Sequence, residues 1–348
     1  MKKALVLLVL LAVVSTFVVA GGRPEAAPTR RIAAMATDVG GLGDQSFNDG
    51  AYQGLLLGEP LGFEARVVES NQQTDYIPNL SGLAEDGAEI VFAVGFLMEE
   101  AVKEAARMHP DTYFGGIDIG GDDDLDNFQG ILYREEQSGY LAGIVAGLMT
   151  NQYADASPRL RSDRNVVGIV LGMFIPPVER FEVGYIQGVK AVNPDATILS
   201  VTSGSFVDQA AGREATLAMI EQGADIVFQA AGLTGLGVIQ AANEEGIFAI
   251  GVDIDQNHVA PETVLTSAIK KIPESVEVVL QSIVDGNFRS GTVSYGLAED
   301  ATGLAPFHQH DAIVPQAVKD AVDDAIRGIL DGSIEVATSR SQIQHLLD

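Results

Sequence analysis

Cysteine and tryptophan are both absent from this chain of 348 residues. Without cysteine there can be no disulfide, no zinc–thiolate site, no cysteine nucleophile and no lipid anchor attached through a thioether. Basic residues are scarce, because 21 lysines and arginines face 48 aspartates and glutamates, which gives a formal net charge of −27. A chain this acidic repels nucleic acid and anionic membrane surfaces, so we expect neither as a partner.

Long apolar runs are absent after the first 20 residues. At the N-terminus, Lys2 and Lys3 precede the run ALVLLVLLAVVSTFVVA, and small residues follow it. This order of basic, apolar and small residues predicts a signal peptide over residues 1–20, cut after Ala20, and therefore an exported protein. Residues 21–30 are expected to form a flexible leader outside the fold. The alternative is that the apolar segment stays uncleaved and anchors the chain in a membrane.

Apolar runs of strand length alternate with helical patterns along the rest of the chain. We expect strands at Ile32–Thr37, Arg66–Glu69, Ile90–Val94, Tyr113–Ile117, Val166–Leu171, Thr197–Val201, Ile226–Gln229 and Phe248–Val252. We expect helices at Phe47–Leu57, Tyr76–Glu85, Leu97–Met108, Glu135–Met149, Pro177–Val192, Asp208–Glu221, Gly235–Asn243, Pro273–Val284 and Pro315–Leu330. Such alternation predicts parallel sheets with helices on both faces.

Two pairs of segments resemble each other. GAEIVFAVGFLMEEAVKEAARMHPDTYFGGID begins at Gly87, and GADIVFQAAGLTGLGVIQAANEEGIFAIGVD begins at Gly223. In the same order, SFNDGAYQG from Ser46 is echoed by RFEVGYIQG from Arg180. The chain is therefore predicted to consist of two similar α/β halves.

Aspartates follow several of the predicted strands. Ligands of open α/β sheets sit beyond the carboxyl ends of the strands. Asp38, Asp118 and Asp253 each stand at such an end. If the two halves face each other, these carboxylates meet in one cleft.

The stretch DVGGLGDQSFNDGAYQG, from Asp38 to Gly54, places Phe47 at the end of a glycine-rich turn. The turn lacks the Lys-Ser/Thr pair of a phosphate loop, and neither it nor GLTGLG at 232–237 has the dinucleotide spacing. Phe47 is open to two interpretations, a core residue or a platform on which a flat ligand stacks. Phe206 in TSGSFVD stands at a similar junction of strand and helix, so the two rings could clamp one planar ligand.

Metal and catalytic motifs are weak. GGDDDLDN at 120–127 has alternate aspartates at 122, 124 and 126, but Asn127 and Tyr133 replace the glycine and glutamate of a calcium loop. We expect a solvated acidic loop there and a surface pair of histidines in HQH at His308–His310, with no metal and no other cofactor. No Gly-x-Ser-x-Gly nucleophile motif is present, and although the carboxylates could act as acids or bases, no obvious nucleophile accompanies them. Nothing in the sequence requires catalysis, and we expect a protein that is not an enzyme.

Several longer stretches resemble the basic membrane protein (Bmp, PnrA-like) family. They are TDVGGLGDQSFNDGAYQGL, TDYIPNL, VGFLMEEAVKEAA, YREEQSGYLAG, IPPVERFEVGYIQGVKAVNP, GADIVFQAAGLTGLGVIQAA, AIGVDIDQ and VLTSAIKK. The resemblance extends from Ile32 to about Leu304. Members of this family are substrate-binding proteins of ABC transporters, and the characterised members bind purine nucleosides.

The resemblance implies an α/β type I periplasmic-binding-protein fold. That fold has two Rossmann-like lobes joined by three crossover strands at a hinge, with a ligand cleft between the lobes. We expect an N-terminal lobe from residues 31–130 plus about 268–292. A C-terminal lobe is expected from residues 131–267 plus about 293–348.

The resemblance also implies roles for eight residues. Phe47 and Phe206 are expected to sandwich the purine. The residues expected beside the base are Asn48 and Asp118. The residues expected beside the ribose are Asp38, Gly232, Asp253 and Lys270, with Lys271 as the alternative lysine.

By the same resemblance, the protein is expected to be a monomer that captures guanosine, inosine or adenosine and delivers it to a permease. Family members are commonly lipoproteins anchored through a cysteine, and this chain has none. It is therefore expected to be freely periplasmic, or associated with the cell envelope through its apolar N-terminal segment. Two alternatives stay open: an enzyme acting on nucleosides, such as a hydrolase or phosphorylase, and a sugar-binding protein of the same fold.

Overall fold

A computed structural model describes residues 31–161 and 163–347. The predicted signal peptide and leader lie outside these residues. The described strands form two six-stranded sheets. The first sheet contains β1 (Arg31–Thr37), β2 (Phe63–Val68), β3 (Ile90–Val94), β4 (Tyr113–Ile117), β5 (Phe128–Tyr133) and β11 (Gly291–Tyr295). The second contains β6 (Val166–Leu171), β7 (Thr197–Thr202), β8 (Ile226–Ala230), β9 (Phe248–Asp253), β10 (Val264–Lys270) and β12 (Thr302–Leu304).

The strand orders of the two sheets correspond. They are β11-β5-β4-β3-β1-β2 in the first sheet and β12-β10-β9-β8-β6-β7 in the second. All pairs of the first sheet are parallel, and in the second only β12 runs antiparallel, against β10. The two α/β halves expected from the repeated segments are therefore present, each with the same order over its first five strands.

The helices in the described part of the chain include the nine that the apolar periodicity predicts, within a few residues of the expected bounds, and a short helix, α10, that was not predicted. They are α1 (Phe47–Leu56), α2 (Tyr76–Glu85), α3 (Glu99–Met108), α4 (Glu135–Met149), α5 (Pro176–Val192), α6 (Gln209–Glu221), α7 (Leu233–Glu245), α8 (Ile272–Val284), α9 (Gln316–Asp331) and α10 (Gln344–Leu347). Short 3-10 turns occupy Glu59–Leu61, Gln73–Asp75, Phe96–Met98, Ala154–Ala156, Asn257–Val259, Leu297–Glu299, His308–His310 and Arg340–Gln342.

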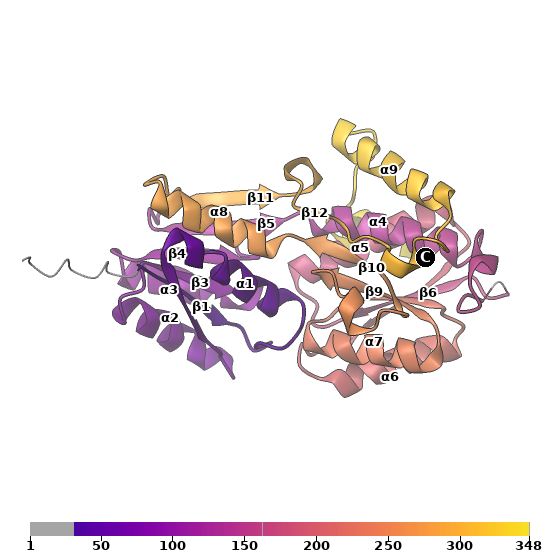
Figure 1. Cartoon of the computed structure of the whole chain (residues 1–348), viewed down its shortest axis with the longest axis horizontal. Coiled ribbons are helices and arrows are strands. Elements are labelled where there is room, and N and C mark those ends of the chain that lie inside the picture. The colour runs from indigo at the N-terminus through magenta and orange to yellow at the C-terminus, as the bar shows by residue number, and fades with distance from the viewer. Residues whose placement is uncertain (1–30, 162, 348) are drawn as a thin grey trace, which may run out of the picture. The chain divides into compact units, whose positions relative to one another are not determined.

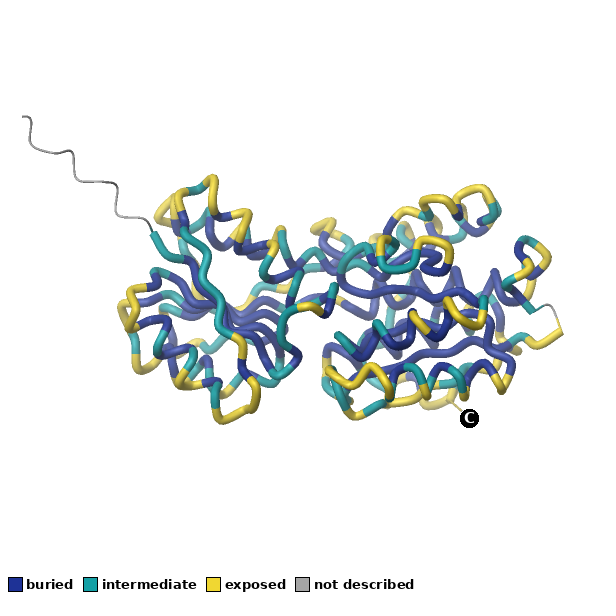
Figure 2. Tube along the Cα trace, turned by 60° about the horizontal axis from the view of Figure 1, so that its bottom comes forward, coloured by how far each residue is buried: buried dark blue, intermediate teal, exposed yellow. Residues whose placement is uncertain are grey.

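Both faces of each sheet are covered by helices. In the first sheet, Ala34 and Ala36 pack under α2 and α3, whereas Ala33 and Met35 pack under α1 and α8. In the second sheet, one face packs against α4, α5 and α9 and the other against α6 and α7. Strands buried on both faces read as continuous apolar runs, which is why the sequence located them. Figure 2 shows these buried strands at the centre of each layered unit.

We use the name N-lobe for the first sheet with its helices and C-lobe for the second. The chain passes between them three times, after β5, after β10 and after β11. Elements from late in the sequence, α8 and β11, consequently lie with the N-lobe, as Figure 1 shows. The predicted lobe limits at 130, 267 and 292 fall inside the three strands that lead into these crossings.

Strand prediction was incomplete at the crossings. The list of expected strands omits β5, β10, β11 and β12, and it begins β2 at Arg66 rather than at Phe63. The sequences of β11 (GTVSY) and β12 (TGL) are short and only half-buried, so they lack the apolar run that marks a central strand. These two strands form because they pair with residues more than thirty positions away in the chain, so local sequence does not predict them.

Candidate ligand-binding cavity

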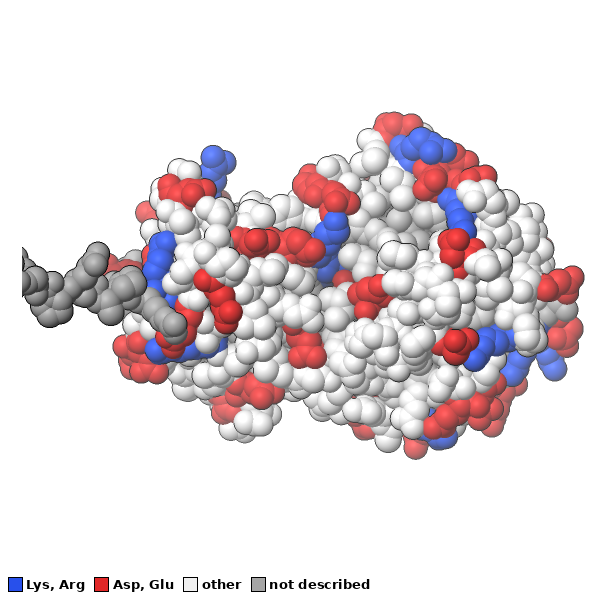
Figure 3. Space-filling view, in the orientation of Figure 1, with Lys and Arg blue, Asp and Glu red and all other residues white. Residues whose placement is uncertain are grey.

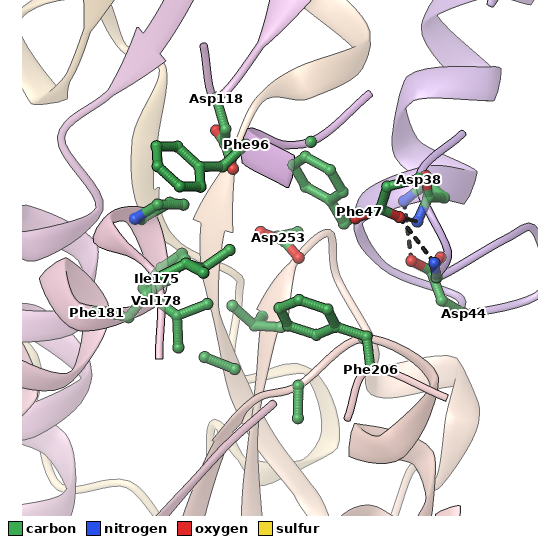
Figure 4. A pocket seen from close by; sticks show the side chains of 18 of the residues that line it. Asp38, Asp44, Phe47, Phe96, Asp118, Ile175, Val178, Phe181, Phe206 and Asp253 are labelled. Carbon is green, nitrogen blue, oxygen red and sulfur yellow. Dashed lines mark hydrogen bonds between the residues drawn. The ribbon is translucent and has the colours of Figure 1, made fainter. Parts of the chain in front are cut away.

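A cavity lies between the carboxyl ends of the two sheets and is lined by both lobes (Figure 4). About 550 Å³ inside it, counting the part open to solvent, is free of protein atoms. That volume is within the range of small-molecule sites. The lining residues are Asp38, Gly40, Asp44, Phe47, Asn48, Gly95, Phe96, Asp118, Ile175, Pro177, Val178, Phe181, Phe206, Ala230, Ala231, Gly232, Val252, Asp253 and Lys270. The structure thus brings all eight residues named from the sequence to one place.

The glycine-rich loop places Phe47 at the cavity. Asp38, directly after β1, accepts a hydrogen bond from the Gly40 N–H at 2.8 Å, and a Cβ on Gly40 would stand 2.9 Å from that carboxylate. The Asp44 carboxylate then accepts the backbone N–H groups of Ser46, Asn48 and Asp49, which satisfies the free donors at the start of α1. Phe47 is the first residue of α1, so the capped turn fixes where its ring points.

Phe206 enters from the C-lobe, between β7 and α6. Figure 4 shows its ring and that of Phe47 on opposite sides of the cavity. Gly172 leaves room for it, because a Cβ there would stand 2.3 Å from the Phe206 ring. Both rings are partly buried against their own lobe's core. Each ring thus packs against the core of its own lobe and also lines the cavity.

Asp118 directly follows β4, and Asp253 is the last residue of the equivalent strand β9. Both have left-handed backbone conformations, with φ of 63° and 64°, which few residues other than glycine adopt. Each is only 6% exposed. Two such aspartates at the same position of both repeats turn their carboxylates toward the cavity, in agreement with the prediction that the strand-end aspartates converge.

Lys270 is fully buried at the end of β10, beside a crossing between the lobes. Its Nζ donates to both carboxylate oxygens of Asp118 at 2.7 Å and to Glu135 at 3.2 Å. It also lies 4.8 Å from the centre of the Phe47 ring. Lys271 instead pairs with the exposed Asp300 at 2.7 Å, so of the two lysines it is Lys270 that reaches the cavity.

The charges around Lys270 perturb one another. Burial lowers the pKa of Lys270, but the carboxylates of Asp118, Glu135 and Asp253 outweigh it and raise the pKa above the ordinary value. Burial raises the pKa of Glu135 to about 8, against the opposing effect of the Lys270 charge. Burial likewise raises the pKa of Asp253, although Lys270 and a hydrogen bond from Ser46 lower it. The ammonium group thus stays charged and is shared among three buried carboxyl groups.

Asp38, Asp44 and Asn48 add further polar groups to the cavity. Burial raises the pKa of Asp38 to about 6 and that of Asp44 to about 7, although both accept backbone N–H groups that lower it. Asn48 donates Nδ2 to Asp38 at 3.3 Å, while its buried Oδ1 has no hydrogen-bond partner. Buried acceptors without partners are costly unless a ligand or water supplies a donor.

The two lobes also touch directly at the edge of the cavity. Ser46 Oγ donates to Asp253 at 2.7 Å and lies 3.2 Å from the carbonyl oxygen of Val252. Gln256 Nε2 donates to the carbonyl of Gln45 at 2.9 Å. The loop that presents Phe47 is therefore held against the strand end that presents Asp253.

Sequence reasoning missed part of the cavity wall. Phe96 follows β3, and Phe181 lies on α5 at the position that matches Phe47 when RFEVGYIQG is aligned with SFNDGAYQG. That echo was a usable signal for a third aromatic residue. Glu135, which holds Lys270, gave no signal of its own, because a buried glutamate at a helix start looks like an exposed one in sequence.

The acidic loop and the histidine pair lie away from the cavity. Asp122 pairs with Arg107 at 3.0 Å. His308 bonds to Asp255 at 2.6 Å, and His310 Nε2 lies 2.8 Å from the Pro261 carbonyl. Over residues 31–161 and 163–347, no three His, Asp or Glu side chains are arranged to hold a metal ion.

Comparison with known proteins decides the family. The family model Bmp, described as "ABC transporter substrate-binding protein PnrA-like", matches residues 32–337. The chain belongs to the Bmp family of ABC-transporter substrate-binding proteins. The Bmp resemblance seen in the sequence is therefore confirmed.

Curated relatives carry names of the same kind. This Bmp-family protein is 32% identical over 326 residues to the CD4+ T-cell-stimulating antigen of Listeria monocytogenes, with 87% of each chain covered. It is 31% identical to the ABC transporter nucleoside-binding protein BmpA of Lactococcus lactis, covering 97% of this chain and 99% of that one. An uncharacterized lipoprotein of Pyrococcus abyssi is 30% identical, with 82% of this chain and 72% of that one covered.

Among solved structures, an ABC transporter solute-binding protein from Aeropyrum pernix K1 superposes with a TM-score of 0.83 at 27% identity. The match covers 91% of this Bmp-family chain and 97% of that one. The predicted periplasmic-binding-protein fold is confirmed by this likeness and by the two six-stranded sheets.

Acidic side chains outnumber basic ones on the surface of the Bmp-family protein. Figure 3 shows Asp and Glu spread over both lobes on the face drawn, with fewer Lys and Arg among them. None of the helices in the described part of the chain has the length and apolar character needed to cross a membrane.

Proposed function

We propose that this protein is an exported binding protein that captures a purine nucleoside in the cavity and delivers it to an ABC permease. The observation that carries the proposal is the pair Phe47 and Phe206, which enter one cavity from two lobes beside buried carboxylates. Two facing rings suit a flat base, and carboxylates suit the hydroxyl groups of a ribose.

In this proposal the base stacks between Phe47 and Phe206. Stacking on an aromatic side chain contributes about 1–3 kcal/mol per base. Asn48 and Asp118 contact the edge of the base, and the unpaired Oδ1 of Asn48 is a ready acceptor for a donor on that edge. Because Asp118 already binds Lys270 with both oxygens, its orientation is fixed before the ligand arrives.

The ribose lies beside Asp38, Gly232, Asp253 and Lys270. Ionised carboxylates accept hydrogen bonds from vicinal hydroxyl groups, and each such bond contributes about 1.5–3 kcal/mol. Four aspartates line the cavity against one lysine. A phosphate group would meet this negative field, so the cavity favours nucleosides over nucleotides.

The Lactococcus lactis relative, named as a nucleoside-binding protein, supports the same ligand class. The lipoprotein name of the Pyrococcus abyssi relative supports a location outside the cytoplasm. The permease contact, the monomeric state and the non-enzymatic role are part of the proposal, since substrate-binding proteins work by capture and release.

Calorimetric titration tests the ligand class. Guanosine should bind at least tenfold more tightly than guanine, with 2′,3′-dideoxyguanosine close to guanine, because only the ribose hydroxyl groups add donors to Asp253 beyond the one from Ser46. Asp253→Ala should reduce that gap, since the variant no longer buries a carboxylate that needs hydroxyl donors. Equal affinity of the wild type for all three compounds would remove ribose recognition.

The two alternative functions are arms of the same experiment. D-ribose or D-arabinose binding more tightly than guanosine would favour a sugar-binding protein and leave the aromatic rings without a role. Release of free guanine from guanosine during incubation, followed by chromatography, would favour the nucleoside-acting enzyme. We expect neither outcome.

A further inference from the structure

The last described segment of the chain, residues 335–347, lies along α5. Gln187 of α5 donates to the carbonyl of Glu335 and accepts from the N–H of Ala337, both at 2.9 Å. Ile343 is 2% exposed and packs against Val183 and Ile186 of the same helix. The family match ends at residue 337, so most of this segment lies beyond the matched part of the chain.

Arg340 is the centre of this attachment. Its Nε and Nη2 both donate to the Glu182 carboxylate at 2.7 Å, and its backbone N–H donates to Glu179 at 2.8 Å. Its guanidinium carbon lies 4.4 Å from the centre of the Phe174 ring. The side chain of Glu182 is only 1% exposed, so this two-point ion pair is shielded from water on one side. Such a planar, bidentate contact fixes orientation as well as position.

The three groups that Arg340 contacts surround one wall of the cavity. Phe174 immediately precedes Ile175, and Glu179 and Glu182 stand on either side of Phe181. Ile175 and Phe181 line the cavity, as does Val178 between them. Arg340 thus holds the first turns of α5 from outside while the same turns present apolar side chains to the cavity.

We propose that Arg340 is a positioning residue for ligand binding, which fixes the wall formed by the start of α5. This proposal rests on the proposed function of the cavity. Arg340 does not line the cavity and acts through Phe174, Glu179 and Glu182. Displacing a wall by a fraction of an ångström loosens every contact that the wall makes with a closely fitting ligand.

Two variants of Arg340 test this. Arg340→Lys keeps the charge for Glu182 but loses the bidentate fork and the flat group over Phe174. Arg340→Ala removes both the ion pair with Glu182 and the contact with Phe174, while the backbone hydrogen bond to Glu179 stays. Arg327→Ala is the matched control, because in the described part of the chain the ion pair of Arg327 is with Asp324, on the exposed face of α9. Guanosine affinity is measured by calorimetry below the melting temperature of every variant, and hydrogen exchange is followed over residues 172–182.

We expect guanosine affinity to fall about tenfold in Arg340→Ala and less in Arg340→Lys, with unchanged affinity in Arg327→Ala. Exchange should rise over residues 172–182 and stay unchanged over β8 and β9. A lower melting temperature with wild-type affinity and wild-type exchange at 172–182 would overturn the proposal, because Arg340 would then only anchor the chain end. If Arg340→Ala fails to fold, Arg340→Lys decides.

The test separates this proposal from the proposed function. A wild type that does not bind guanosine contradicts the nucleoside proposal. In that case the exchange measurement, made without ligand, still decides whether Arg340 orders the start of α5: a selective rise at 172–182 supports positioning, and no rise overturns it.

Discussion

At the scale of single residues, Phe47 and Phe206 each join a core on one side and the cavity on the other. Replacing either by alanine should weaken guanosine binding by about 1–3 kcal/mol, the contribution of one stacked base. Phe288→Ala is the control, because Phe288 packs against Tyr113 at 4.3 Å and does not line the cavity.

Calorimetry and thermal melting distinguish the two roles of the rings. The control should lower the melting temperature without changing guanosine affinity, whereas Phe47→Ala and Phe206→Ala should mainly change affinity. If Phe206→Ala unfolds, or if it binds guanosine with the affinity of the wild type, the Phe206 ring belongs to the core and has no role in stacking.

The raised pKa of Asp38 should make the stability of the protein depend on pH. Burial raises its pKa from 3.8 to about 6 in the folded protein, so folding favours the protonated carboxyl group. That contribution is complete below about pH 4 and is lost as pH rises through 6, which amounts to roughly 3 kcal/mol at neutral pH. Asp38→Asn cannot ionise and keeps the oxygen that accepts from Gly40. It should therefore raise the free energy of unfolding relative to wild type by about 2 kcal/mol more near pH 7.5 than near pH 4.5.

Urea unfolding of both proteins at the two pH values measures this difference. Asp324→Asn, at a largely exposed position on α9, serves as the control. The same difference between wild type and Asp38→Asn at both pH values would contradict a raised pKa of Asp38.

At the scale of elements, glycines set how closely helices pack. A Cβ on Gly184 or Gly188 of α5 would stand 2.0–2.1 Å from carbonyl oxygens of α4, and one on Gly139 or Gly143 of α4 would stand 2.3–2.4 Å from carbonyl oxygens of α5. In the N-lobe, Gly54 of α1 approaches α8 in the same way, with Pro273 O at 2.8 Å. The G-x-x-x-G motif occurs at Gly50–Gly54 and again at Gly184–Gly188, and close contact between helices explains it better than contact with a ligand.

Gly184→Ala should consequently lower the free energy of unfolding by about 3 kcal/mol, because the backbone of α4 has to move. Gly82→Ala is the matched control on α2, where nothing lies within 4 Å of an added Cβ. It should stabilise the protein by about 0.5–1 kcal/mol through helix propensity. Chemical denaturation measures both, and equal effects would show that α4 and α5 can separate without loss.

At the scale of the whole molecule, the contacts between the lobes describe a closed cavity. Ser46 of the N-lobe and Asp253 of the C-lobe are joined by a hydrogen bond, and Gln45 and Gln256 by another. Guanosine should favour this closed arrangement because it contacts both lobes, so small-angle scattering should give a smaller radius of gyration with guanosine than without it.

Ser46→Ala tests the link between closure and release. It removes the contact to Asp253 while leaving the cavity side chains in place, so guanosine should dissociate about five- to tenfold faster with a smaller change in the association rate. Ser282→Ala is the control, because its hydroxyl donates to the carbonyl of Val279 within α8 and the residue does not line the cavity. An unchanged dissociation rate, together with an unchanged scattering profile at saturation, would exclude closure as part of binding.

The sequence by itself determined the layered α/β class, the two halves and almost every helix. Helices and central strands are encoded locally, because a period of 3.6 or a continuous apolar run shows which side of each element is buried. The positions of predicted strand ends pointed to Asp38, Asp118 and Asp253, and the junctions of strand and helix pointed to Phe47 and Phe206. The family resemblance added Asn48, Gly232 and Lys270.

Only the tertiary structure decided what depends on residues far apart in the chain. β11 and β12 are placed by pairing with strands on the far side of a lobe crossing, and Glu135 becomes part of the site because it contacts Lys270, 135 positions further along the chain. Phe181 faces the cavity because α5 packs against α4, and Arg340 reaches that helix from beyond the family match. Such contacts leave no periodic trace in the sequence, since each partner supplies one side chain and the fold supplies the proximity.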